Sequence, residues 1–129
     1  MHDGQFRVEV FSSVPVVTAA GDIDITNAAE LQSALLEAAE RGHGTLVADL
    51  TRTQFCDASA LRALVAASTQ AKADGGEMLL VAPSPGMLRI LEITRADSVV
   101  PNFTNLAEAL AQASGNGSNG RRPAGRWRR

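Results

Sequence analysis

One stretch decides the fold of this chain: Leu46-Val-Ala-Asp-Leu-Thr-Arg-Thr-Gln-Phe-Cys-Asp-Ala-Ser-Ala-Leu61. Its mostly apolar start predicts a buried strand, the polar middle predicts a loop, and Asp57 begins a segment with the apolar spacing of a helix. Ser59 lies at that predicted helix start, close to Asp57. A serine there can accept a phosphate, and the charge added beside an acidic residue disturbs whatever docks on the loop. The stretch therefore favours a switch protein over a metabolic enzyme.

Apolar periodicity on both sides of this stretch predicts a regular alternation of strands and helices. The predicted strands are 6–11, 16–20, 45–50, 78–82 and 99–101, and the predicted helices are 28–41, 57–74, 83–93 and 106–113. The first two strands form a predicted hairpin, whereas the later strands are joined through helices. Strand–helix–strand units favour parallel pairing with right-handed crossovers, so helices are expected to cover the sheet. The predicted class is α/β, with the order ββαβαβαβα.

Capping residues mark where these elements begin and end. Thr26 or Asn27 can cap the first helix, and Glu30 follows Asn27 at the spacing of a capping box. Gly42 is expected to end that helix. Pro101 is expected in an edge strand, because proline has no N–H to donate within a central strand.

The composition is that of one globular domain followed by a tail. The chain has 129 residues, of which 45% are hydrophobic, 20% charged and only 4% aromatic, so Val, Ile, Leu and Ala must build its core. Residues 1–113 carry 7 basic and 14 acidic side chains, whereas residues 114–129 hold five arginines and no acid. Because Gly, Ser and Asn dominate the start of that tail, we expect a domain over 1–113 and a flexible, disordered tail over 114–129.

Cysteine usage and the lack of long apolar runs predict a cytoplasmic protein. Cys56 is the only cysteine, which excludes an internal disulfide and suits a reducing compartment. No apolar run approaches the roughly 18 residues of a membrane span. The first residues, Met1-His-Asp-Gly-Gln5, lack the basic and apolar regions of a secretory signal. We therefore expect no membrane association.

Three motifs together carry a resemblance to a known family. They are Gly21-Asp-Ile-Asp24, the central motif Phe55-Cys-Asp-Ala-Ser-Ala-Leu61 with its preceding strand, and Leu88-Arg-Ile-Leu-Glu-Ile-Thr94. With the order of elements, they make residues 5–113 resemble the STAS domains, and most closely the bacterial anti-sigma factor antagonists. The central motif is the specific one. The resemblance implies a STAS-type fold, a mostly parallel mixed β-sheet covered by about four helices.

The resemblance implies a phosphorylation switch at Ser59. In the family the loop usually reads Asp-Ser-Ser/Thr-Gly-Leu, and its third residue is phosphorylated. Here Ser59 keeps that position, while Ala58 and Ala60 replace a hydroxyl residue and a glycine. The unphosphorylated protein would then bind an anti-sigma factor that is itself a serine kinase, and the sigma factor would be released. Phosphorylation would end the binding, and a PP2C-type phosphatase would restore it.

Residues around Ser59 are expected to contact the partner. The predicted contact set is Asp22, Asp24, Asp57, Ala58, Ala60 and Arg62. Asp57 is expected to cap the helix and hold the loop, and Arg62, one turn along, could pair with the phosphate. The resemblance places the loop of Asp22 and Asp24 beside that of Ser59. On local sequence alone, Ser59 could equally be an ordinary first-turn serine, and the two aspartates ordinary turn residues.

Two other classes of function stay open from the residues. One is a ligand-binding or sensory STAS module without a phosphoswitch, although the chain has no glycine-rich phosphate loop. The other is an enzyme, but no Ser-His-Asp, Cys-His or metal-ligand cluster stands out, since His2 and His43 lie far apart. We expect no catalysis, no cofactor and no bound metal.

Two further residues allow alternative interpretations. Cys56 is expected to pack in the core as a small apolar residue, with a redox input beside the switch as the alternative. Trp127 stands among arginines, a composition also found where nucleic acids bind. The favoured interpretation is a solvated tail that can fold back on the acidic body, so no direct nucleic-acid binding is expected.

Overall fold

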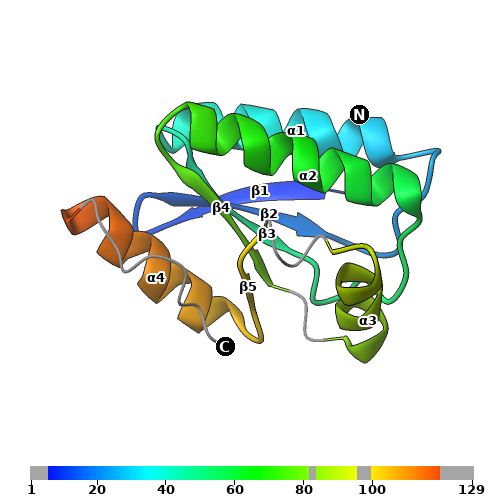
Figure 1. Ribbon diagram of the computed structural model, residues 1–129. Coiled ribbons are helices and arrows are strands. Elements are labelled where there is room, and N and C mark those ends of the chain that lie inside the picture. The colour runs from blue at the N-terminus through cyan, green and yellow to red at the C-terminus, as the bar shows by residue number, and fades with distance from the viewer. Residues whose placement is uncertain (1–5, 82–83, 96–99, 120–129) are drawn as a thin grey trace.

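The computed structural model describes residues 6–81, 84–95 and 100–119, whose strands form one mixed sheet (Figure 1). The strands in this part of the chain are β1 (Phe6–Phe11), β2 (Val14–Ala19), β3 (Thr45–Asp49), β4 (Glu77–Val81) and β5 (Asn102–Phe103). The helices are α1 (Ala28–Arg41), α2 (Ala58–Ala73), α3 (Pro85–Ile93) and α4 (Leu106–Asn119). The sheet order is β1-β2-β3-β4-β5, with β1 antiparallel to β2 and the other neighbours parallel. The predicted class and element order are confirmed.

Helices cover both faces of the sheet. Figure 1 shows α1 and α2 side by side over one face and α4 against the other. Beneath α1 and α2, the core contains Leu31, Leu35 and Leu64, none more than 1% exposed. On the opposite face, Ala109 of α4 packs in a second cluster with Leu79 of β4. Because each fully buried leucine contributes about 1.5–3 kcal/mol, this burial stabilises the layered arrangement.

The predicted hairpin is present as β1 and β2, joined by the turn Ser12–Ser13. Both serines have positive φ (52° and 70°), as the two-residue type I′ turn requires. β2 begins at Val14, earlier than predicted from the sequence, and includes Pro15. Pro15 stands opposite Val10 of β1. Antiparallel pairs alternate between hydrogen-bonded and non-hydrogen-bonded positions, and proline fits the latter because it needs no N–H there.

Two boundaries predicted near the C-terminal end were wrong. The last strand is Asn102–Phe103, and residues 100 and 101 of the predicted strand 99–101 precede it, while residue 99 lies outside the described residues. The Pro101 carbonyl accepts the Leu80 N–H at 2.9 Å, so the ladder with β4 begins at Pro101 through its carbonyl alone. The last helix continues past residue 113 to Asn119. Residues that follow an existing helix need no new nucleus, so this segment can be helical although its Gly, Ser and Asn residues would not start a helix alone. The rest of the predicted disordered tail lies outside the described residues.

Candidate functional site

Two loops meet at the edge of the sheet where parallel strands end. Residues 20–27 connect β2 to α1, and residues 50–57 connect β3 to α2. The carboxyl ends of parallel neighbours lie at one edge of a sheet, so the loops are adjacent. Backbone hydrogen bonds join them, from Ile23 N to Phe55 O and from Asp57 N to Ile23 O, each at 3.2 Å. The structure therefore brings together the two predicted parts of the site.

Asp22, in loop 20–27, holds the backbone of loop 50–57 through hydrogen bonds. Its Oδ1 accepts the backbone N–H groups of Gln54 at 2.9 Å and Phe55 at 3.1 Å. Thr53 adds a link in the same place, because its fully buried hydroxyl donates to the Gly21 carbonyl at 2.8 Å. Asp22 thus has a positioning role that the sequence did not predict.

Asp24 organises its own loop. Its Oδ1 accepts hydrogen bonds from both the hydroxyl and the backbone N–H of Thr26. These hydrogen bonds lower the pKa of the Asp24 carboxyl, and the bond from the hydroxyl has the larger effect. The capping box predicted at Asn27 was wrong, since Asn27 precedes α1 but makes no side-chain cap. Its amide oxygen instead accepts the Asp24 N–H at 2.9 Å, and its amide nitrogen donates to the Asp22 carbonyl at 3.2 Å. The loop therefore captures the side chain that would otherwise cap the helix.

Asp57 connects the two loops to the start of α2. Its Oδ1 accepts the N–H groups of Ser59 at 2.9 Å and Ala60 at 3.2 Å, which makes it the expected N-cap. Its Oδ2 accepts the N–H of Ile25 at 3.1 Å, from the other loop. One carboxylate therefore fixes both the helix start and the position of the neighbouring loop.

Ser59 lies in the first turn of α2 and is partly exposed. Within the described residues its hydroxyl makes no hydrogen bond, so the oxygen is available for modification. Ala58 and Arg62 are exposed, and Arg62 shares a face of α2 with Ser59 because it lies three positions further along the helix. Ala60 is fully buried, so its methyl group lies inside the fold and not on the surface that a partner would touch.

Two exposed apolar side chains border this site and were missed in the sequence. Ile25 is 74% exposed and Phe55 is 54% exposed. Their backbone N–H groups are held by the carboxylates of Asp57 and Asp22, so both side chains extend from fixed backbone. The available sequence signal was a large apolar residue outside every predicted strand and helix. We name Ile25 and Phe55 the apolar rim.

Cys56 is buried at 2% exposure, as predicted. Desolvation, with smaller effects of Asp57 and Asp22, raises the pKa of its thiol to about 11. Because only the thiolate is nucleophilic, this environment suppresses its reactivity at neutral pH.

We expect native Cys56 to react with a disulfide reagent such as DTNB at least about tenfold more slowly than in the urea-unfolded chain. Burial restricts access and the raised pKa reduces the thiolate fraction, so both effects slow the native reaction. Absorbance of the released thiolate measures both rates. Equal rates would contradict the core role and favour a redox-accessible cysteine.

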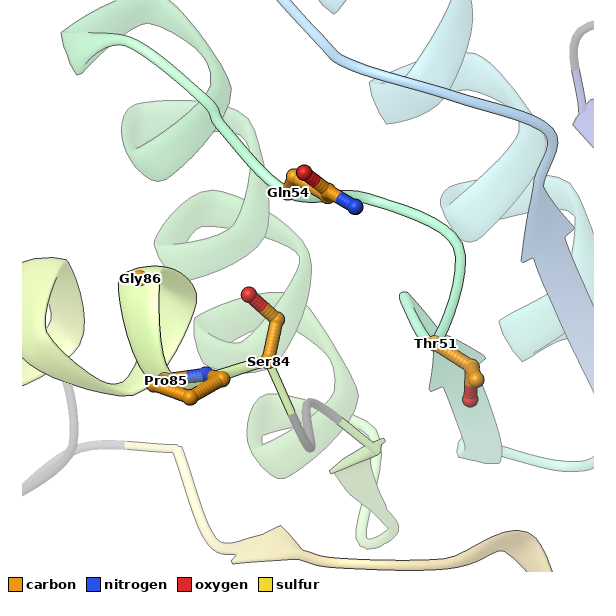
Figure 2. A pocket seen from close by; sticks show the side chains of 5 residues that line it. All are labelled: Thr51, Gln54, Ser84, Pro85 and Gly86. Atoms are coloured by element: carbon orange, nitrogen blue, oxygen red, sulfur yellow. The ribbon is translucent and has the colours of Figure 1, made fainter.

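A shallow groove lies between loop 50–57 and the start of α3. It has a volume of about 550 Å³ and is lined by Thr51, Gln54, Ser84, Pro85 and Gly86. Figure 2 shows Gln54 on its loop across from Ser84 and Pro85 at the start of α3. The Ser84 hydroxyl caps α3 by accepting the Met87 N–H at 3.4 Å. The groove thus places polar groups beside the loop that carries Phe55.

Two kinds of feature are absent from the part of the chain that the structure describes. No helix in this part is both long and apolar enough to cross a membrane. In the same ranges, no group of three His, Cys, Asp or Glu side chains is arranged to hold a metal ion.

The chain is similar to a known protein family and to solved structures. A family model described as the STAS domain matches residues 5–109. The structure of an anti-sigma factor antagonist from Mycobacterium paratuberculosis is similar, with 27% identity, a TM-score of 0.77, and coverage of 85% of this chain and 93% of that chain.

Two more distant structures share the fold. The Bacillus cell fate determinant SpoIIAA in its phosphorylated form is 21% identical, with a TM-score of 0.62 and coverage of 83% of this chain and 97% of that chain. The murine Solute Carrier 26 family member A9 anion transporter is 15% identical, with a TM-score of 0.71 and coverage of 90% of this chain but 23% of that chain. The same fold therefore occurs both alone and within a larger protein.

Proposed function

Because the chain belongs to the STAS domain family, we propose that it is an anti-sigma factor antagonist whose binding is switched off by phosphorylation of Ser59. The observation that carries the proposal is the accessibility of the Ser59 hydroxyl. Its hydroxyl makes no hydrogen bond within the described part of the chain, and its side chain is partly exposed in the first turn of α2. Asp57 links this turn directly to Ile25 of the apolar rim. A kinase can reach the hydroxyl, and a partner docking on the rim would cover it.

The switch acts through charge at the docking surface. A phosphate adds about −1.5 to −2 charges at neutral pH. The nearest helix-start donors, the N–H groups of Ser59 and Ala60, are already bonded to the Asp57 carboxylate. The phosphate must therefore rely on water and on Arg62, whose side chain is exposed one turn along. Burying that charge against a partner costs affinity while leaving the fold intact.

The proposed partner is an anti-sigma factor that is also a serine kinase, with a PP2C-type phosphatase reversing the modification. The protein itself catalyses nothing in this cycle and acts in the cytoplasm as a regulator of transcription under stress. The similar protein from Mycobacterium paratuberculosis, an anti-sigma factor antagonist at 27% identity, supports this role. Asp22 contributes by holding the loop of Phe55 and Asp24 by holding the loop of Ile25, and both add acidic groups near the docking surface.

Incubation with the cognate kinase and ATP is expected to add one phosphate to the wild-type protein and none to Ser59→Ala. Intact mass spectrometry measures the product, and peptide mapping assigns the site. Thr69→Ala is the matched control, because Thr69 is an exposed hydroxyl residue on the same helix. An unlabelled wild type, or labelling that persists in Ser59→Ala, would contradict the proposed switch.

The alternative is a sensory STAS module that binds a ligand or supports a larger assembly. The groove at Thr51, Gln54 and Ser84 and the STAS-like fold within the murine anion transporter favour keeping this candidate. Calorimetry with GTP and ATP distinguishes the two. Saturable binding that survives Ser59→Ala and is lost in Gln54→Ala would support the sensory module.

A further inference from the structure

β1 is an outer strand of the sheet, and within the described residues it pairs with β2 alone (Figure 1). Its side chains alternate, so Phe6, Val8 and Val10 share one face and Arg7 and Glu9 the other. Phe6 and Val8 are partly buried against the core, whereas Val10 is 58% exposed. Unpaired backbone groups at an edge recruit further strands. β1 thus presents an open edge beside an exposed apolar side chain.

The hairpin turn decides which backbone groups of β1 face outward. In a hairpin with a two-residue turn, the flanking residues, here Phe11 and Val14, form a hydrogen-bonded pair, and the pairs alternate from there. The next pair, Val10 with Pro15, is therefore without hydrogen bonds, which suits a residue that has no N–H. By the same alternation, the N–H and C=O groups of residues 6, 8 and 10 point away from β2.

The charges of β1 select one way in which two copies could pair about a two-fold axis. When Val8 of one copy lies opposite Val8 of the other, Arg7 of each copy lies opposite Glu9 of the other copy. These are non-hydrogen-bonded pairs, in which side chains come closest. The neighbouring registers place Arg7 opposite Arg7 or Glu9 opposite Glu9, and like charges directly opposite are destabilising. The strand is therefore self-complementary in one antiparallel register.

We propose that the edge of β1 binds a second copy of this chain, so that the two sheets become continuous through Val8. Phe6 of each copy then covers Val10 of the other, which removes the exposed apolar side chain from water. A symmetric contact of this kind closes at two copies. The strand contact alone buries less than the roughly 1,200 Å² of stable complexes, so the dimer forms reversibly at high concentration. None of its contacts involves Ser59, so it is independent of the proposed function.

Sedimentation velocity over a concentration series tests the dimer with charge reversals. Arg7→Glu leaves two acidic side chains, at positions 7 and 9, on one face of β1, and Glu9→Arg leaves two basic ones. Each variant alone is therefore expected to dimerise at least about tenfold more weakly than wild type. An equimolar mixture of the two variants is expected to dimerise again, because an acidic strand then faces a basic one. The double variant Arg7→Glu/Glu9→Arg is also expected to dimerise.

Glu92→Arg is the matched control, because it reverses an exposed charge on α3 and is expected to dimerise like wild type. Circular dichroism checks that every variant is folded. A wild type that stays monomeric at all concentrations, or a mixture that fails to restore the dimer, overturns the proposal. If the reversals instead change binding of the anti-sigma factor without changing self-association, the edge receives a strand of that partner and the proposal is also overturned.

Discussion

Replacing Asp57 by alanine is expected to lower the free energy of unfolding by about 2–3 kcal/mol. Its carboxylate accepts the N–H groups of Ser59 and Ala60 with one oxygen and that of Ile25 with the other. Loss of the cap costs typically about 1 kcal/mol, and the Ile25 N–H loses its acceptor at a further cost of about 1–2 kcal/mol. Thermal unfolding followed by circular dichroism should show a Tm lower by about 8–15 °C.

Asp57→Asn separates the two contributions. Asparagine caps helices as well as aspartate, so one side-chain oxygen can still accept the helix N–H groups. Its amide NH₂ cannot accept the Ile25 N–H, so about half of the loss is expected to remain. An asparagine variant as stable as wild type would show that the contact between the loops contributes nothing. An asparagine variant as unstable as Asp57→Ala would show that the helix cap contributes nothing to stability.

Replacing Ser59 by aspartate is expected to weaken binding to the anti-sigma factor by about a hundredfold or more. The added carboxylate lies in the first turn of α2, which Asp57 connects to Ile25 of the apolar rim. A docked partner would take that charge out of water, and even with Arg62 one turn along the loss of hydration costs several kcal/mol. The fold is expected to survive, because an acidic residue at a helix start is favourable. Calorimetric titration of the purified anti-sigma factor measures the affinity.

Two variants show whether charge is the cause. Ser59→Asn has the size of aspartate without its charge and is expected to bind within about tenfold of wild type. Thr69→Asp adds the same charge at the far half of α2, where Thr69 is exposed, and is expected to change little. If Ser59→Asn loses as much affinity as Ser59→Asp, size rather than charge is responsible. If Ser59→Asp binds like wild type, Ser59 is not the switch.

Short-range signals explain how much of the fold was predictable. The apolar runs of β3 and β4 and the Asp57 cap each lie within a few neighbouring residues, so these elements appeared where the sequence placed them. The prediction at Asn27 failed for the opposite reason. Asn27 had a sound capping signal, but a competing acceptor and donor in its own loop took the side chain. A local pattern lists the hydrogen bonds a residue can make, and the assembled loop selects among them.

The sequence by itself determined the order of the strands and helices, the STAS family and the place of Ser59 at the start of a helix. The element order and the helix start depend on periodicity and on capping within one turn, and the family on a resemblance carried by three short motifs. Tertiary structure alone decided that Asp22 and Asp57 hold the opposite loop and that Ile25 and Phe55 stand exposed on it. Those contacts join residues 32 or 33 positions apart, and they exist because β2 and β3 pair in parallel and in one register. No pattern confined to either loop contains that register.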